Sequence, residues 1–224
     1  MEVLKTQDGS STILSNKYNV TYHSRFGAIQ ESQHVFIQNG LLPVLQSQLD
    51  QIKILEIGFG TGLNFLLTHL VTFPKTFQLK YTALDLVPLK KDIIHQINYI
   101  SQLNLNVEYE DFFYSIHSLP WSEWYQLDQY THLKKELIDL VNYQPTCNNF
   151  NVIYFDAFAP SAQPELWETN VLEKIYHSLV SNGILVTYCA KGSVKRTFKN
   201  LGGLVESLPG PPGKREMIRI TKLT

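Results

Sequence analysis

An apolar run that ends in an acid and leads into three alternating glycines is the segment of this chain best suited to bind a ligand. The run ILE covers residues 54 to 56, and the segment GFGTG after it carries Gly58, Gly60 and Gly62. Glycine tolerates positive φ angles and lets a ligand approach the backbone closely, and the N-terminus of the following helix would face that ligand. The pattern predicts a strand, a ligand-binding turn and a helix.

The details of this turn favour a nucleoside with an amino-acid group. The spacing differs from the dinucleotide fingerprint G-x-G-x-x-G, and there is no Lys-Ser/Thr pair to hold phosphates. Glu56 lies just before the first glycine and Asn64 just after the third. This layout is typical of S-adenosylmethionine (SAM) pockets, so we expect both side chains and the three glycines to bind the cofactor. A tight turn in an ordinary α/β protein is the alternative.

Acids also follow other segments with the character of strands. LKYTALD ends in Asp85, which we expect to bind the ribose hydroxyls, since parallel strands present their carboxyl ends at the ligand edge of a sheet. NVEYED is expected to form a third strand whose Asp111 lies beside the adenine. Residues 151 to 155 read as a buried strand that delivers Asp156 to the same edge, where we expect the chemistry.

The alternation of strands and helices predicts one α/β domain over residues 1–224, with helices on both faces of a mostly parallel, seven-stranded sheet. LVESL and EMIRITKL would close the sheet as a hairpin with an antiparallel C-terminal strand. Residues 1–51 are expected to be an N-terminal extension of two short strands and one or two amphipathic helices. Residues 112–150 are expected to be a helical insertion, because WSEWYQLDQYTHLKKELIDLVNY has helical spacing.

Composition limits the protein class. A chain of 224 residues with 44% apolar and 17% charged residues fits one globular domain. Its apolar runs are too short to span a membrane, and its first residues do not resemble a signal peptide, so we expect a cytoplasmic protein without membrane contact. Cys147 and Cys189 lack metal-ligand spacing, and we expect no metal site.

Charge is distributed unevenly along the chain. The net charge is −1, but residues 189 to 224 carry eight basic and two acidic residues. A basic end on an otherwise acidic body predicts a face that contacts phosphates, and scattered solvated charges are the alternative.

Several motifs together resemble the methyltransferase domain of the MnmC family and its stand-alone form MnmD. The resemblance runs from about Tyr22 to Ile220, and no stretch resembles the FAD-dependent oxidase half of the fused enzyme. The segments that carry it are YHSRFGAIQESQHVFI (22–37), LEIGFGTGLNF (55–65), YFDAFAPSAQPELW (154–167) and GPPGKREM (210–217).

The resemblance implies a Rossmann-like class I SAM-dependent methyltransferase. Its substrate would be the wobble uridine in the anticodon region of tRNA, where 5-aminomethyl(-2-thio)uridine becomes 5-methylaminomethyl(-2-thio)uridine. An ammonium has no lone pair, so the acceptor must react as the neutral amine. Asp156, with the carbonyls of Ala157 and Phe158, would hold this amine; we favour positioning over strict general-base catalysis and leave both open.

The remaining site residues follow from the same resemblance. Glu31 is expected beside SAM, and Phe26 and Trp167 are further candidates to stack on a base. The residues expected to bind the substrate are Tyr22, Phe158, Pro160, Lys191, Arg196, Lys214 and Arg215.

Two other enzyme classes share these features. The first is a methyltransferase that acts on a small-molecule amine, and the only feature that it leaves unexplained is the basic C-terminal face. An aminopropyl transferase is a weaker alternative, because its polyamine channel needs several acids and the DAFAPSAQPE segment supplies only Asp156 and Glu165.

Overall fold

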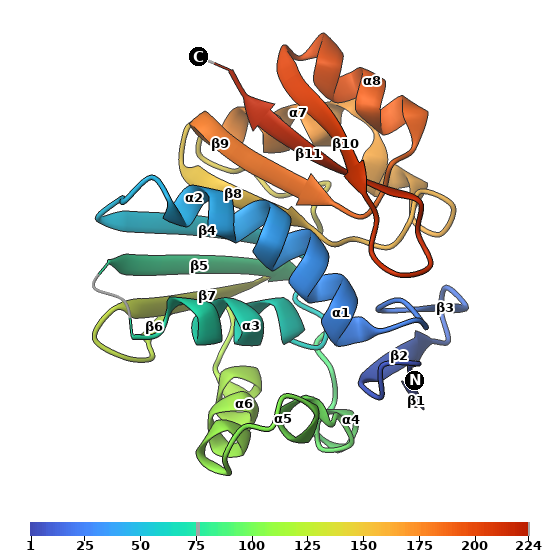
Figure 1. Cartoon of the computed structure of the whole chain (residues 1–224), viewed down its shortest axis with the longest axis vertical. Helices are drawn as coiled ribbons and strands as arrows, with labels where there is room; N and C mark the ends of the chain where they lie inside the picture. Colours follow the sequence, from blue (N-terminus) through green and yellow to red (C-terminus); the bar gives the residue numbers. More distant parts are fainter. Residues whose placement is uncertain (75–76, 224) are drawn as a thin grey trace.

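The computed structural model describes residues 1–74 and 77–223. Within them the main sheet has eight strands in the order β10-β11-β9-β8-β4-β5-β7-β6 (Figure 1). Their bounds are β4 Gln51–Ile57, β5 Gln78–Asp85, β6 Trp124–Gln126, β7 Thr131–Leu137, β8 Phe150–Phe155, β9 Leu179–Thr187, β10 Gly203–Pro209 and β11 Glu216–Lys222.

The predicted parallel sheet with an antiparallel end is confirmed, with one additional strand. Strands β7, β5, β4, β8 and β9 pair in parallel, and β11 runs antiparallel between β9 and β10. The hairpin of β10 and β11 is the one predicted from LVESL and EMIRITKL. The short β6 adds an eighth, antiparallel strand at the edge beside β7.

The N-terminal extension forms a small sheet followed by helices, and the sheet has three strands where two were predicted. The sheet joins β1 (Glu2–Lys5), β2 (Ser11–Ser15) and β3 (Val20–Thr21). The helical segment runs through α1 (Ala28–Ser32), the π-helix η1 (Gln33–Leu41) and α2 (Leu42–Leu45). The other helices are α3 Leu63–Thr72, α4 Lys91–Ile94, α5 Tyr99–Gln102, α6 Glu108–Ser118, the 3₁₀-helix η2 Pro164–Trp167, α7 Thr169–Ser178 and α8 Gly192–Asn200.

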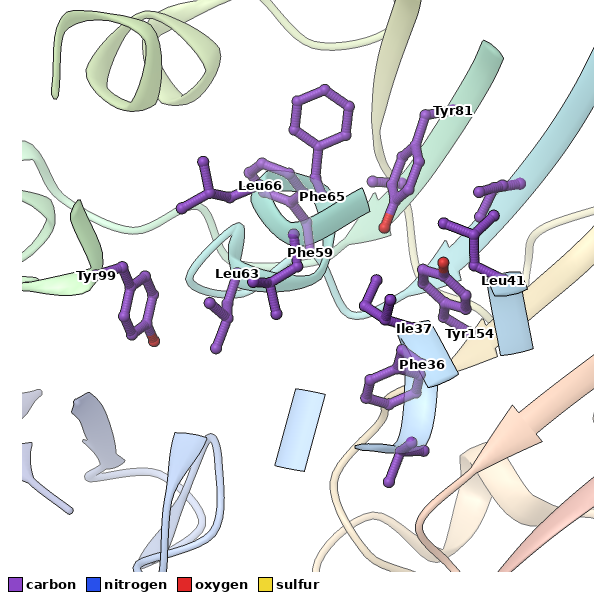
Figure 2. Close-up of a cluster of buried hydrophobic side chains, with 14 of the residues drawn as sticks. Phe36, Ile37, Leu41, Phe59, Leu63, Phe65, Leu66, Tyr81, Tyr99 and Tyr154 are labelled. Carbon is purple, nitrogen blue, oxygen red and sulfur yellow. The ribbon is translucent and has the colours of Figure 1, made fainter. Parts of the chain in front are cut away.

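Successive residues of the central strands supply two separate cores. Ile54 and Tyr154 belong to one core, whereas the neighbouring Leu55 and Ile153 belong to the other. This alternation places each core on its own face of the sheet. Helices η1 and α3 pack over the first core, where Figure 2 shows Phe36, Phe65, Tyr81 and Tyr154 gathered, and α7 and α8 supply the second.

The predicted helical insertion at 112–150 is wrong for most of its length. Only its start lies in α6, and the tryptophan- and tyrosine-containing segment forms β6 and β7. Side chains of β7 alternate between buried and partly exposed, with Thr131, Leu133 and Lys135 buried. Strand pairing with β5 therefore overrides the helical spacing.

The prediction of a third strand over NVEYED is also wrong. Glu108, Glu110 and Asp111 lie in the first turn of α6, where acidic side chains interact favourably with the helix dipole. The third strand of the parallel set is β7.

Candidate active site

The glycine segment forms a tight turn between β4 and α3. Gly58 has a φ of 91°, and a Cβ atom there would lie 2.7 Å from the carbonyl oxygen of Asp156. Both backbone angle and space therefore require glycine at this position. The amides of Gly58 and Phe59 donate to the carbonyl of Leu84, at 2.9 and 3.0 Å, which fixes the turn to the end of β5.

Thr61, in the middle of this turn, is held by three aromatic side chains that the sequence did not single out for this role. Tyr99 donates to the Thr61 hydroxyl at 3.0 Å, and His23 Nε2 lies 2.7 Å from the same oxygen. Burial lowers the pKa of His23 to about 4, so its ring is neutral near pH 7. His117 Nε2 contacts the Thr61 carbonyl oxygen at 3.1 Å.

A cavity of about 260 Å³ opens at the carboxyl ends of the central strands. It extends from the glycine turn past the end of β5 to the segment after β8, and Tyr18, Tyr22 and His23 of the N-terminal extension contribute to its wall. The strand-end residues that line it are Ile57, Gly58, Phe59, Gly60, Thr61, Leu84, Asp85, Leu86, Val87, Ile138, Asp139, Leu140, Asp156, Ala157 and Phe158.

Asp85 lies at the predicted position in this cavity. Its Oδ2 accepts from the Gly60 amide at 2.7 Å and its Oδ1 from the Val87 amide at 2.9 Å. Each carboxylate oxygen can accept a further hydrogen bond, as a ribose diol would require. Burial raises the pKa of Asp85, although the hydrogen bonds from these two amides act to lower it.

Asp111 does not line this cavity, and Asp139 lies where an acid after the third parallel strand was expected. Asp111 is exposed on α6, whereas Asp139 follows β7 between Ile138 and Leu140. The segment THLKKEL gave only a weak signal for this acid, because two adjacent lysines interrupt its alternation of apolar and polar residues.

Asp156 lies at the end of β8 and is bound to the glycine turn through Asn64. Asn64 Nδ2 donates to Asp156 Oδ2 at 2.8 Å and to Glu56 Oε1 at 2.9 Å. Burial and the nearby charge of Glu31 raise the pKa of Asp156 to about 7. Burial also raises the pKa of Glu56 well above its usual value, and Tyr81 donates to its Oε2. Glu56 and Asn64 lie behind the turn and do not line the cavity.

The two carbonyl groups considered as further acceptors are already engaged. Tyr188 donates its hydroxyl to Ala157 O, and Trp167 donates its indole N–H to Phe158 O, each at 2.8 Å. Trp167 is buried against Phe155 and so is not available to stack on a base. Phe158 packs between Tyr18 and Tyr22, with ring centroids 5.2 and 5.1 Å apart. Pro160 is partly exposed in the same loop.

Glu31 and Lys214 contact each other across the long sequence separation between the N-terminal extension and the β10–β11 loop. Lys214 Nζ lies 2.6 Å from Glu31 Oε1, and the Ser24 amide donates to Glu31 Oε2 at 2.7 Å. Neither charged residue lines the cavity, although both act on the pKa of Asp156.

The basic C-terminal face separates into engaged and exposed residues. Lys195 pairs with Glu216 at 2.6 Å, and Arg219 donates two hydrogen bonds to Glu206. Lys222 donates to Asn148, His177 and Leu179. The exposed residues are Lys191, Arg196, Lys199 and Arg215.

The cavity has the hydrogen-bond acceptor and the surfaces that SAM requires. Asp85 suits the ribose diol, Leu86 and Leu140 give an apolar surface for the adenine, and the glycine turn lets the amino-acid part approach the backbone. Among the described residues, no helix is long and apolar enough to span a membrane. Nor do they contain a group of His, Cys, Asp or Glu residues that could hold a metal ion.

The strand order and this site define a class I SAM-dependent methyltransferase. The profile of a family described as S-adenosyl-L-methionine-dependent methyltransferase matches residues 121–222. A crystal structure of MnmC2 from Aquifex aeolicus superposes with a TM-score of 0.80 and 25% identity, over 100% of this chain and 70% of that one.

Comparison with curated proteins identifies the family. The bifunctional 5-methylaminomethyl-2-thiouridine biosynthesis protein MnmC of Pseudoalteromonas atlantica is 31% identical over 96% of this chain and 33% of its own length. The MnmC protein of Leptospira interrogans is 30% identical over 95% of this chain and 34% of its own. This chain belongs to the MnmC methyltransferase domains, and it spans about a third of the length of these relatives.

Proposed function

We propose that this chain transfers the SAM methyl group to the primary amine of 5-aminomethyluridine, 2-thiolated or not, at the wobble position of tRNA. The observation that carries the proposal is the position of Asp156, a carboxyl group with a pKa near 7 at the edge of a cavity suited to SAM. The names of the relatives, which refer to 5-methylaminomethyl-2-thiouridine biosynthesis in tRNA, support this acceptor.

Bound SAM supplies an electrophilic methyl group. The acceptor amine arrives mostly as an ammonium, so the site must accept a proton before or during transfer. A carboxylate whose conjugate acid has a pKa near 7 is a better match for this task than an ordinary one. Asn64 fixes the direction of the Asp156 side chain, and ionised Asp156 orients the amine and accepts its hydrogen bond or proton.

The tRNA would approach over the exposed basic face. Lys191, Arg196 and Arg215 are free to contact phosphates, whereas Lys195 and Arg219 are paired within the protein. The wobble base must leave its anticodon stack to reach the cavity, and Tyr22 and Phe158 are among the aromatic side chains at its wall. A tRNA substrate would make this a cytoplasmic enzyme.

The proposal is tested by transfer of labelled methyl from SAM to tRNA isolated from cells that lack this activity, followed by nucleoside analysis. We expect labelled 5-methylaminomethyluridine, thiolated or not, and a strongly reduced yield with Asp156→Asn. SAM binding without label in tRNA would contradict the proposal and favour a small-molecule amine as acceptor.

A further inference from the structure

Lys214 is a basic residue whose ammonium points into the protein. Its Nζ lies 2.6 Å from Glu31 Oε1 and 3.5 Å from the centroid of the Tyr188 ring. The Glu31 side chain is only 6% exposed. A buried carboxylate and an aromatic face on the same cation are the two groups that proteins use to bind alkylammonium ions. We call Glu31 and Tyr188 the ammonium cradle.

The loop that carries Lys214 is fixed in place by the N-terminal extension. His34 Nε2 contacts Pro209 O at 2.8 Å, just before this loop. Gly213 packs on the Phe26 ring so closely that a Cβ atom would lie 2.0 Å from it. Figure 1 shows the β10–β11 loop beside the start of α1. The inward position of Lys214 is therefore set by its neighbours, unlike that of the exposed Arg215 next to it.

The ammonium cradle adjoins the residue proposed to receive the acceptor. Tyr188 donates its hydroxyl to the carbonyl of Ala157, the residue after Asp156. The charges of Glu31 and Lys214 both act on the Asp156 carboxyl. An alkylammonium bound in the cradle would thus lie close to Asp156.

Given the proposed function, we propose that the ammonium cradle of Glu31 and Tyr188 binds the aminomethyl group of the incoming acceptor as an ammonium, before Asp156 takes it as the amine. Lys214 occupies the cradle when no acceptor is bound. The lysine side chain ends in the same CH₂–NH₃⁺ group as the acceptor, so the two compete for one carboxylate and one ring. When displaced, Lys214 lies beside Arg215, where a phosphate of the tRNA can neutralise it. Lys214 thus makes the empty site selective, because an acceptor that lacks the ammonium cannot replace it.

The test is equilibrium binding of 5-aminomethyluridine, a nucleoside without phosphates, to the protein saturated with S-adenosylhomocysteine. Lys214→Met removes the competing charge and keeps an unbranched side chain that is one atom shorter. If Lys214 occupies the cradle in about nine molecules of ten, its removal strengthens nucleoside binding about 10-fold. Glu31→Gln weakens it by about 10-fold or more, because the carboxylate partner is lost. Lys91→Met, an exposed lysine on α4 outside the cavity, serves as the charge-matched control.

The neutral analogue 5-hydroxymethyluridine separates this inference from the proposed function. We expect Lys214→Met to strengthen binding of the amine but not of the alcohol. Unchanged or weaker binding of 5-aminomethyluridine to Lys214→Met would overturn the inference and leave the proposed function intact, provided that the wild type still methylates tRNA. Loss of label in tRNA with the wild type would instead overturn the proposed function.

Discussion

The side-chain amide of Asn64 donates to the carboxylate of Asp156 at 2.8 Å, which joins the helix after the glycine turn to the end of β8. The same Nδ2 donates to Glu56 at the end of β4. The glycine turn and the carboxylate of Asp156 are therefore joined in one hydrogen-bonded unit. The bond favours the ionised form of Asp156, since hydrogen bonds to a carboxylate lower its pKa.

Asn64→Ala should reduce the rate of methyl transfer more than the affinity for SAM. Asp156 would lose its fixed direction, and we expect a single-turnover rate lower by about 10–100-fold at saturating SAM. The dissociation constant of SAM should change by less than about threefold, since Asn64 does not line the cavity. Weaker SAM binding with an unchanged rate at saturation would instead assign Asn64 to the cofactor.

Asp156→Asn should stabilise the ligand-free protein at pH 8 but not at pH 4. The folded-state pKa of Asp156 is about 7, above the value of 3.8 for an unperturbed carboxyl group. Between these values the folded state binds more protons than the unfolded state, so wild-type stability falls as the pH rises. We expect the variant to gain about 1–3 kcal/mol at pH 8, measured by urea unfolding. Parallel curves of unfolding free energy against pH would contradict this.

Gly58→Ala should abolish SAM binding and destabilise the fold by about 2–4 kcal/mol, because the methyl group meets the Asp156 carbonyl in a strained backbone conformation. Gly202→Ala is the matched control. Its φ of 87° is also positive, but nothing lies within 4 Å of the added Cβ atom. It should cost only about 1–2 kcal/mol and leave SAM binding unchanged. An equal decrease in stability for the two variants in thermal unfolding experiments would show that the contact with Asp156 has no effect.

Arg196→Ala should weaken tRNA binding and reduce its salt dependence, whereas Arg219→Ala should do neither. Arg196 is exposed, whereas Arg219 is already bound by Glu206. Each lost phosphate contact should lower the slope of log K against log salt by about 0.7–0.9. The measurement is the affinity for tRNA that has not yet been methylated, at several salt concentrations. The same decrease in slope for both variants would show that the pairing with Glu206 does not matter.

The glycine turn, Asp85 and Asp156 were predictable because their signals are local. A positive φ requires glycine, and an acid after a buried strand lies at the ligand edge of a parallel sheet. The segment that forms β7 was not predictable as a strand, because the adjacent Lys134 and Lys135 conceal its alternation of buried and exposed residues. Lys135 is buried, and its ammonium donates to the carbonyl of His117.

The neighbours of Asp156 were equally hidden. Glu31 and Lys214 meet only because the N-terminal extension packs against the β10–β11 loop. Sequence alone assigned the first to SAM and the second to phosphates. Their pairing is a tertiary contact that no local pattern encodes.

The pH dependence of single-turnover methyl transfer to tRNA, in the wild type and in Asp156→Asn, tests the central claim most directly. A group that must be ionised becomes active as the pH rises through its pKa, which is about 7 for Asp156. We expect the wild-type rate to rise with pH to a half-maximum near that value, and the variant to be slow and to lack this step. An unchanged rate and profile in Asp156→Asn would contradict any role for this carboxylate in the reaction.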